Sequence, residues 1–129
     1  MLVVDASVAV WACMSDAPLD ELDADLVAPP VMWSEARSAL HTLASRGDLP
    51  ADHAAQAHDR LITAPVRVRR HRRLGPEAWS VADELGWART YDAEYVALAR
   101  LLDCRVVTAD ERLRRGADRL GFVVTVQEL

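Results

Sequence analysis

Leu2-Val3-Val4-Asp5 opens the chain, and Val106-Val107-Thr108-Ala109-Asp110 repeats its pattern near the other end. Each segment is a short run of mostly apolar, β-branched residues followed by an aspartate, and such runs predict buried strands. The residues after each aspartate have helical periodicity. Because strands that alternate with helices form parallel sheets covered on both faces, these two segments predict an α/β fold.

The rest of the chain continues this alternation of strand and helix. Strands are predicted at Leu2–Val4, Leu26–Ala28, Val66–Arg69, Cys104–Thr108 and Phe122–Val124. Helices are predicted at Ala6–Met14, Val31–Arg46, Ala51–Thr63, Gly75–Leu85, Thr90–Leu102 and Asp110–Leu120. In the first helix we expect Val8 and Trp11 to face the core. The predicted architecture is a three-layer sandwich in which a short, mainly parallel central sheet is flanked by helices.

The composition is that of one soluble globular domain spanning residues 1–129, with 51% hydrophobic and 27% charged residues. A core of this size needs no disulfide, so Cys13 and Cys104 are interpreted as small buried hydrophobic residues. Asp5 interrupts the apolar start of the chain, and no run of eighteen apolar residues follows. We therefore expect no signal peptide, no membrane segment and a cytoplasmic location.

The basic residues are unevenly distributed in a chain whose formal net charge is −5. All 15 are arginine, and five of them lie in Arg67–Arg73, whereas acidic residues crowd Asp16–Asp25. The arginine-rich segment has two interpretations, which are contact with RNA phosphates and protection of an edge strand against association. The sequence leaves both open.

Four carboxylates are candidates for a shared site. Asp5 and Asp110 each follow the carboxyl end of a strand, and open α/β sheets bind ligands at that edge. Glu35 lies on the flank of the apolar face of its helix, and Asp92 lies in the first turn of another. Each has an alternative interpretation: the two aspartates as N-caps, Glu35 as a solvated flank residue, and Asp92 as a complement to the helix dipole.

Together these acids would repel one another strongly, because two unit charges about 4 Å apart interact by about 4 kcal/mol at an effective dielectric near 20. The chain contains no lysine to neutralise them. A hard divalent cation with oxygen ligands, Mg²⁺ or Mn²⁺, is therefore predicted. Such cations promote phosphodiester hydrolysis by activating water and stabilising the leaving oxygen.

Four motifs resemble those of PIN-domain ribonucleases of the VapC type, the toxins of toxin–antitoxin pairs. They are Val4-Asp5-Ala6-Ser7-Val8, Ser34-Glu35-Ala36, Tyr91-Asp92-Ala93-Glu94-Tyr95-Val96-Ala97-Leu98-Ala99 and Val107-Thr108-Ala109-Asp110-Glu111-Arg112-Leu113. The resemblance covers the whole chain in order and length, and it implies a single PIN domain with metal-dependent endoribonuclease activity.

The resemblance also implies roles for individual residues and partners. Asp5 and Asp92 would be the principal metal ligands, with Glu35 and Asp110 completing the acidic site. Ser7 and Thr108 would be polar supports at its edge. The implied partners are an RNA substrate, a small cognate antitoxin and a second copy of the chain. The apolar helices near Trp11 and Trp33 also favour a homodimer.

Arginines and tryptophans provide further candidates for RNA binding. Arg112 and Arg115 follow Asp110 on its helix and are predicted to guide phosphates, the alternative being an ordinary solvated helix face. The tryptophans either stack on bases or pack in the core or an interface. They are Trp11, Trp33, Trp79 and Trp87.

Several other functions are disfavoured by what the sequence lacks. A phosphoacceptor receiver-type domain resembles this pattern but uses a strand-end lysine. No P-loop motif and no G-x-S-x-G motif occurs, which argues against those forms of nucleotide binding and serine hydrolysis. The remaining alternative is a non-catalytic protein-interaction module with a vacant acidic pocket.

Overall fold

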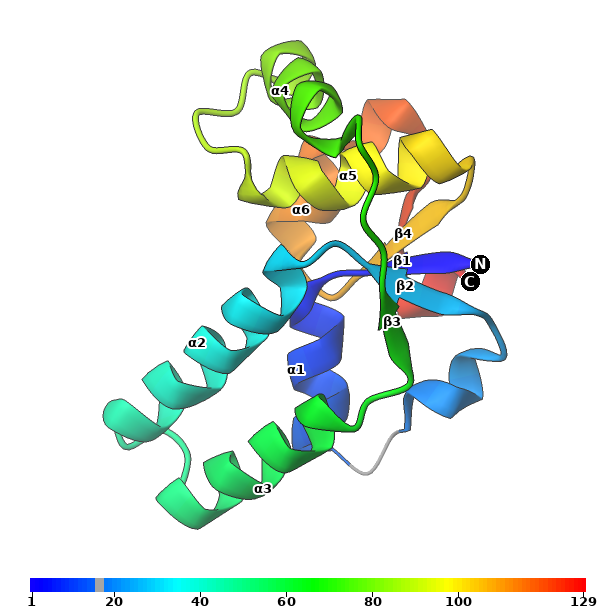
Figure 1. Cartoon of the computed structure of the whole chain (residues 1–129). Coiled ribbons are helices and arrows are strands. Elements are labelled where there is room, and N and C mark those ends of the chain that lie inside the picture. The colour runs from blue at the N-terminus through cyan, green and yellow to red at the C-terminus, as the bar shows by residue number, and fades with distance from the viewer. Residues whose placement is uncertain (16–17) are drawn as a thin grey trace.

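The computed structural model describes residues 1–15 and 18–129 (Figure 1). Its strands are β1 (Leu2–Val4), β2 (Leu26–Ala28), β3 (Val66–Val68), β4 (Arg105–Thr108) and β5 (Val123–Thr125). Its α-helices are α1 (Ala6–Met14), α2 (Val31–Ser45), α3 (Ala51–Ile62), α4 (Leu74–Leu85), α5 (Tyr91–Leu102) and α6 (Glu111–Gly116). Short 3-10 helices occupy Leu19–Leu22, Asp118–Leu120 and Val126–Glu128. Asp16, part of the acidic run noted above, lies outside the described residues.

The strands form one parallel sheet in the order β3-β2-β1-β4-β5. The central strand β1 pairs Val3 with Val27 on one side and with Val106 on the other. Figure 1 shows α1, α2 and α3 on one side of this sheet and α4, α5 and α6 on the other. The predicted three-layer α/β architecture is confirmed. Since all strands are parallel, their carboxyl ends meet at one edge.

The core surrounds the central strands, which carry almost only apolar side chains. All three residues of β1 are buried, as are Val106 and Val107 of β4. Helix α5 covers these strands with its buried residues, Ala93 and residues 95–99. A strand buried on both faces needs such continuous apolar runs, which explains why the strand segments were readable from the sequence.

Two expectations about the helices were wrong. Trp11 is 47% exposed, because α1 buries the face formed by Val8, Ala9, Ala12 and Cys13 and turns its indole to solvent. The helix predicted at Asp110–Leu120 stops at Gly116, and a separate 3-10 helix follows. Glycine disfavours helix, which accounts for the break.

The structure also tests the predictions about the two cysteines and about membrane segments. Both cysteines are free thiols; Cys13 is buried, as expected, whereas Cys104 is only half-buried. Within residues 1–15 and 18–129, no helix has the length and apolar character needed to cross a bilayer.

Candidate active site

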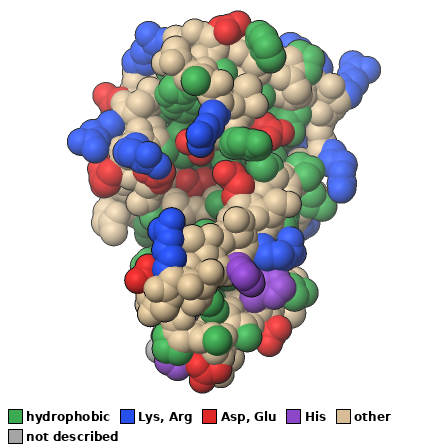
Figure 2. Space-filling view, turned by 90° about the vertical axis from the view of Figure 1, so that its left-hand side faces the viewer, with side chains coloured by type: hydrophobic (Ala, Val, Ile, Leu, Met, Phe, Trp, Pro, Cys, Tyr) green, Lys and Arg blue, Asp and Glu red, His purple; other side chains and the backbone are tan. Residues whose placement is uncertain are grey.

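A cavity of about 660 Å³ opens at the carboxyl edge of β1 and β4. Its wall carries all four predicted carboxylates, which come from four different parts of the chain: Asp5, Glu35, Asp92 and Asp110. Figure 2 shows acidic side chains gathered in a hollow, with arginine side chains around it. The fold therefore brings together four acids that the sequence separates by up to 105 positions.

Asp5 is the most buried of the four, with 3% of its surface exposed. One oxygen, Oδ1, accepts hydrogen bonds from Val8 N at 3.0 Å and from Ser7 Oγ at 2.7 Å. The other, Oδ2, accepts one from Thr108 Oγ1 at 2.5 Å. Asp5 is thus the N-cap of α1, as the alternative interpretation predicted, and it also lines the cavity.

The Ser7 and Thr108 hydroxyls join the two strand ends that carry the acids. Ser7 Oγ accepts a hydrogen bond from Ala109 N at 2.9 Å, and Thr108 Oγ1 accepts one from Asp110 N at 2.9 Å. Both hydroxyl protons remain directed at Asp5. This network fixes the Asp5 carboxylate relative to the loop that carries Asp110, so both residues lie where polar supports were predicted.

Asp110 and Asp92 are held differently. Asp110 Oδ1 accepts hydrogen bonds from Arg112 N at 2.9 Å and Leu113 N at 3.4 Å, so it is the N-cap of α6. Asp92 lies in the first turn of α5, whose N-cap is Thr90, and its carboxylate makes no hydrogen bond with the rest of the described chain. Helix capping therefore accounts for Asp110, whereas Asp92 occupies the first-turn position in which its charge can complement the helix dipole, as its alternative interpretation predicted.

Glu35 projects from α2 and is bound by a buried tyrosine. The Tyr95 hydroxyl donates to Glu35 Oε1 at 2.6 Å, and Tyr95 itself is 1% exposed. Buried tyrosines usually find a partner for the hydroxyl, so a carboxylate at the edge of the core satisfies both groups. This contact fixes the position of Glu35 on the cavity wall.

Burial and mutual repulsion raise the pKa of three of the four cavity carboxylates. Burial is the main cause of the raised pKa of Asp5, and the charge of Asp92 adds to it. Burial also dominates the raised pKa of Glu35, opposed by the Tyr95 hydrogen bond and reinforced by Asp92. Partial loss of water raises the pKa of Asp92, as does the charge of Asp110. The cavity therefore favours a bound cation or proton.

The donor atoms on the cavity wall suit a hard cation. The ionisable and hydroxyl ligands there are oxygens, and neither histidine nor cysteine lines the cavity. Within the described part of the chain, however, no group of three or more His, Cys, Asp or Glu side chains is arranged to hold a metal ion by itself. Mg²⁺ is commonly held by one or two carboxylates with several waters, so the carboxylate oxygens of the cavity are the type of ligand that this ion binds.

Arg112 and Arg115 lie in different places relative to the cavity. Arg112 lines it, with its Nη2 3.6 Å from Asp110 Oδ2. The Arg115 side chain donates from Nε to Glu111 O at 3.3 Å and does not belong to the cavity wall. Of the two predicted RNA contacts, only Arg112 adjoins the acids.

Other arginines are engaged in ion pairs away from the cavity wall. Arg114 binds Glu128 and Asp118, and Arg67 of the edge strand β3 binds Asp25 at 2.6 Å. The other arginines of that segment are exposed, and Arg73 lies 3.9 Å from Glu77. Both earlier interpretations of that segment stay predictions.

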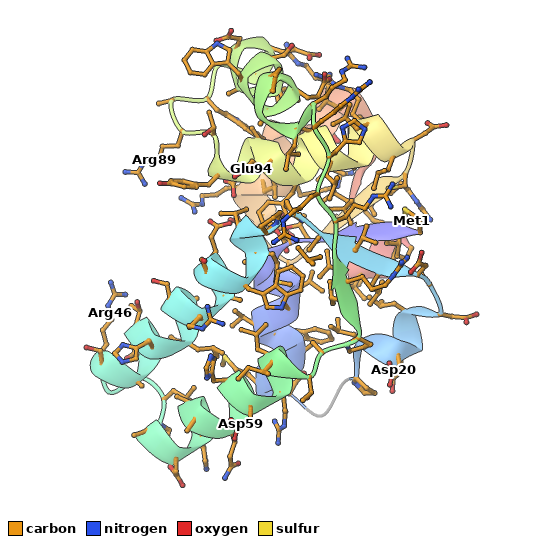
Figure 3. All side chains as sticks on the ribbon, in the orientation of Figure 1. Met1, Asp20, Arg46, Asp59, Arg89 and Glu94 are labelled. Carbon is orange, nitrogen blue, oxygen red and sulfur yellow. The ribbon has the colours of Figure 1, made fainter. Side chains whose placement is uncertain are left out.

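Sequence reasoning missed four residues at the site, Glu94, Tyr95, Arg89 and Tyr91, whereas Trp87 was already a candidate for base stacking. Glu94 is a fifth acid, whose pKa is raised by burial and whose charge raises that of Glu35. Tyr95 was named only as part of a sequence motif and received no role of its own, although a buried tyrosine hydroxyl requires a partner. Trp87, Arg89 and Tyr91 line the cavity from the chain between α4 and α5. Figure 3 shows Arg89 projecting outward from this part of the molecule.

The fold and cavity define a parallel α/β protein with an oxygen-rich acidic site at the carboxyl edge of its sheet. The PIN domain family matches residues 2–119. VapC ribonuclease Mb0985 of Mycobacterium bovis and ribonuclease VapC9 of Mycobacterium tuberculosis are each 39% identical to this chain over 117 residues, covering 88% of this chain and 88% of each relative. The chain therefore belongs to the PIN-domain family, and within it to the VapC type.

A solved structure agrees with this assignment at the level of the fold. The crystal structure of PAE2754 from Pyrobaculum aerophilum superposes with a TM-score of 0.74 at 24% identity. The match covers 98% of this chain and 90% of that chain. The arrangement of sheet and helices is thus shared over nearly the whole length of both molecules.

Proposed function

We propose that this chain, as a single PIN domain, is a metal-dependent endoribonuclease and the toxin of a toxin–antitoxin pair. The observation that carries the proposal is the cavity in which Asp5, Glu35, Asp92 and Asp110 meet. The 39% identity to VapC ribonucleases supports RNA as the substrate. We place the protein in the cytoplasm, where RNA is available to it.

Asp5 and Asp92 are the proposed ligands of Mg²⁺ or Mn²⁺, with Glu35 and Asp110 completing the site. Such a cation supplies positive charge that polarises a phosphate and makes a nearby water more acidic. Ser7 and Thr108 orient Asp5 through their two hydrogen bonds. Because the N-cap bonds of Asp110 use Oδ1, its Oδ2 is left to face the cation or Arg112.

Glu35 is the proposed group that moves a proton. Tyr95 binds its Oε1, which leaves Oε2 as the atom that accepts a proton from water in the cavity. The raised pKa of Glu35 suits this task, because general bases work best when their pKa approaches the working pH. Arg112 then holds a phosphate oxygen beside the acids through its planar guanidinium.

The competing function is a protein-interaction module whose acidic pocket performs no chemistry. Labelled RNA incubated with purified protein in Mg²⁺, Mn²⁺ or excess EDTA separates the two. The nuclease cleaves with either cation and stops with EDTA, whereas the module cleaves in none of the three. Asp92→Asn should abolish cleavage, and Asp83→Asn, an exposed aspartate of α4 away from the cavity wall, is the matched control. Full cleavage in EDTA would refute the metal requirement.

We propose two protein partners, an antitoxin and a second copy of the chain. A cationic antitoxin side chain entering the cavity would neutralise the carboxylates in place of the metal and silence the enzyme. Trp11 and Met14 are exposed one turn apart on α1, and Trp33 is half-buried on α2, which gives apolar surface for association. Light scattering at micromolar concentration, with and without the neighbouring gene product, tests both; a monomer without a co-purifying partner contradicts them.

A further inference from the structure

The chain between α4 and α5 forms one side of the acidic cavity and has no role in the site described so far. Gly86, Trp87, Ala88 and Arg89 line the cavity, followed by Tyr91 at the start of α5. This side therefore presents a cation and aromatic rings beside a group of carboxylates. Neither an arginine nor an exposed tyrosine is needed to bind a metal ion, so these side chains call for another explanation.

This segment is held in a fixed position by its neighbours. Gly86 ends α4 in the left-handed conformation, with a φ of 71°, and Trp87 N donates to Ala82 O at 2.9 Å. The Trp87 indole packs over Gly116 of α6, where a Cβ would lie 3.4 Å from its Cζ2 atom. Trp87 therefore anchors the segment, and the side chains that follow it are presented from a defined backbone.

The side chains of Tyr91 and Arg89 are both exposed, and neither is held by a polar contact with the described residues. Tyr91 is 56% exposed, in contrast to Tyr95 four residues later, which is buried against Glu35. Neither Tyr91 nor Arg89 makes a side-chain hydrogen bond or ion pair within residues 1–15 and 18–129. Side chains at i and i+4 share one side of a helix, so Tyr91 lies on the side of α5 that faces the cavity.

An aromatic ring and a guanidinium beside a phosphate-cleaving site match the chemistry of an unpaired nucleotide. Bases of single-stranded RNA stack on aromatic side chains, and arginine pairs with the phosphate between them. In a duplex, both faces of each base are covered by neighbouring bases and are closed to such a ring. Tyr91 lines the same cavity as the proposed metal ligand Asp92, which places the ring at the wall of the proposed reaction centre.

Resting on the proposed nuclease function, we propose that Tyr91 and Arg89 form a subsite for one unpaired nucleotide of single-stranded RNA, adjoining the phosphate that is cleaved. Tyr91 stacks on the base, Arg89 pairs with the flanking phosphate, and Trp87 positions both by fixing the segment. The enzyme thereby selects RNA that is single-stranded at the cleavage point. Stacking tolerates every base, so this subsite selects strandedness more than sequence.

Fluorescence anisotropy in EDTA measures RNA binding without cleavage. The probe is a labelled single-stranded RNA, compared with a blunt duplex of the same sequence. Tyr91→Leu should weaken single-strand binding about tenfold, and Tyr91→Phe should bind like wild type, because base stacking on an aromatic ring is what is lost or kept. Trp79→Leu is the matched control, since Trp79 is an aromatic residue of α4 that is 68% exposed and lies outside the cavity wall.

The arginine is tested by the salt dependence of the same binding. Arg89→Gln should flatten the slope of log Kd against log salt by about 0.7, the value for one phosphate contact on a single strand. Arg46→Gln, at the far end of α2, should leave the slope unchanged (Figure 3). This variant pair remains informative if Tyr91→Leu folds poorly, which thermal melting reveals.

Two results would overturn the subsite: equal effects of Tyr91→Leu and Trp79→Leu, or equal affinity of the wild type for the single strand and the duplex. Failure of the subsite and failure of the proposed function are distinguishable. If wild-type protein cleaves RNA with Mn²⁺ while Tyr91→Leu binds normally, only the subsite is wrong. If binding depends on Tyr91 but no cation supports cleavage, the subsite stands and the nuclease proposal falls.

Discussion

Replacing Tyr95 with phenylalanine removes one hydroxyl from the core and changes the chemistry of Glu35. The ring keeps its shape and its buried position, and the hydrogen bond of 2.6 Å to Glu35 Oε1 is lost. That hydrogen bond lowers the pKa of Glu35 and so opposes the effect of burial. In Tyr95→Phe the pKa of Glu35 should therefore rise further.

The size of the rise follows from the energy of the lost bond. Hydrogen bonds to charged groups contribute about 1.5–3 kcal/mol, and water in the cavity replaces part of this one, so the lower figure applies. One pKa unit corresponds to about 1.4 kcal/mol, so the pKa of Glu35 should rise by about one unit. If ionised Glu35 accepts the proton, the acidic limb of the rate profile should move to higher pH by the same amount.

The assay is single-turnover RNA cleavage in Mn²⁺ across a pH series, with thermal melting of each variant. Tyr91→Phe is the control, because it removes the hydroxyl of an exposed tyrosine on the same helix. Glu35→Gln should remove the titrating group and with it this limb. An acidic limb that is identical in Tyr95→Phe and wild type, with a normally folded protein, would refute the role assigned to Glu35.

Three further predictions concern the cavity. Three of its carboxylates have raised pKa values, so at these three groups the folded, metal-free protein binds more protons than the unfolded chain does above about pH 4. Their contribution to stability is lost as pH rises through the folded pKa values, so in EDTA the melting temperature should be higher at pH 5 than at pH 8, and the reverse order would contradict the raised values. Asp92→Asn removes a repelling charge without losing a hydrogen bond, and Asp110→Asn keeps the helix cap, so neither variant should lower the melting temperature in EDTA. Both variants should nevertheless lose RNA cleavage and most of the stabilisation by Mn²⁺. A full Mn²⁺-induced rise of the melting temperature in both variants would exclude the two aspartates as metal ligands. Arg112→Gln should flatten the slope of log Kd against log salt for RNA binding by about 0.7, whereas Arg115→Gln, away from the cavity wall, should leave it unchanged. Equal slopes in the two variants would show that proximity to the acids does not determine which arginine contacts RNA phosphate.

The local patterns of the sequence were sufficient to predict the elements and the sheet type. Strands buried on both faces need continuous apolar runs, so β1 and β4 were visible as Leu2–Val4 and Val106–Val107. Because strands that alternate with helices run parallel, their carboxyl ends meet at one edge. Asp5 and Asp110 could therefore be placed at one edge without knowledge of the strand order.

The contacts that give the site its properties were decided by the tertiary structure alone. Thr108 reaches Asp5 because β4 pairs directly with β1, and the strand order depends on how all helices cover the sheet together. Tyr95 meets Glu35 only where α5 and α2 converge at the sheet edge. No local period encodes such a meeting, since periodicity tells which face of an element is buried but not which element lies opposite.

The same distinction explains the error at Trp11 and the omission of Tyr91. A large apolar side chain favours burial on average, yet α1 covers the sheet with its small residues and leaves the indole outside. Tyr91 is exposed because the segment before α5 is anchored by Trp87 against α6, a contact between parts of the chain about thirty residues apart. The sequence determines which face each element can bury, because hydrophobic burial follows local composition. Only the packed structure decides which side chains stay exposed and can form a site, because their exposure depends on which surfaces the other elements cover.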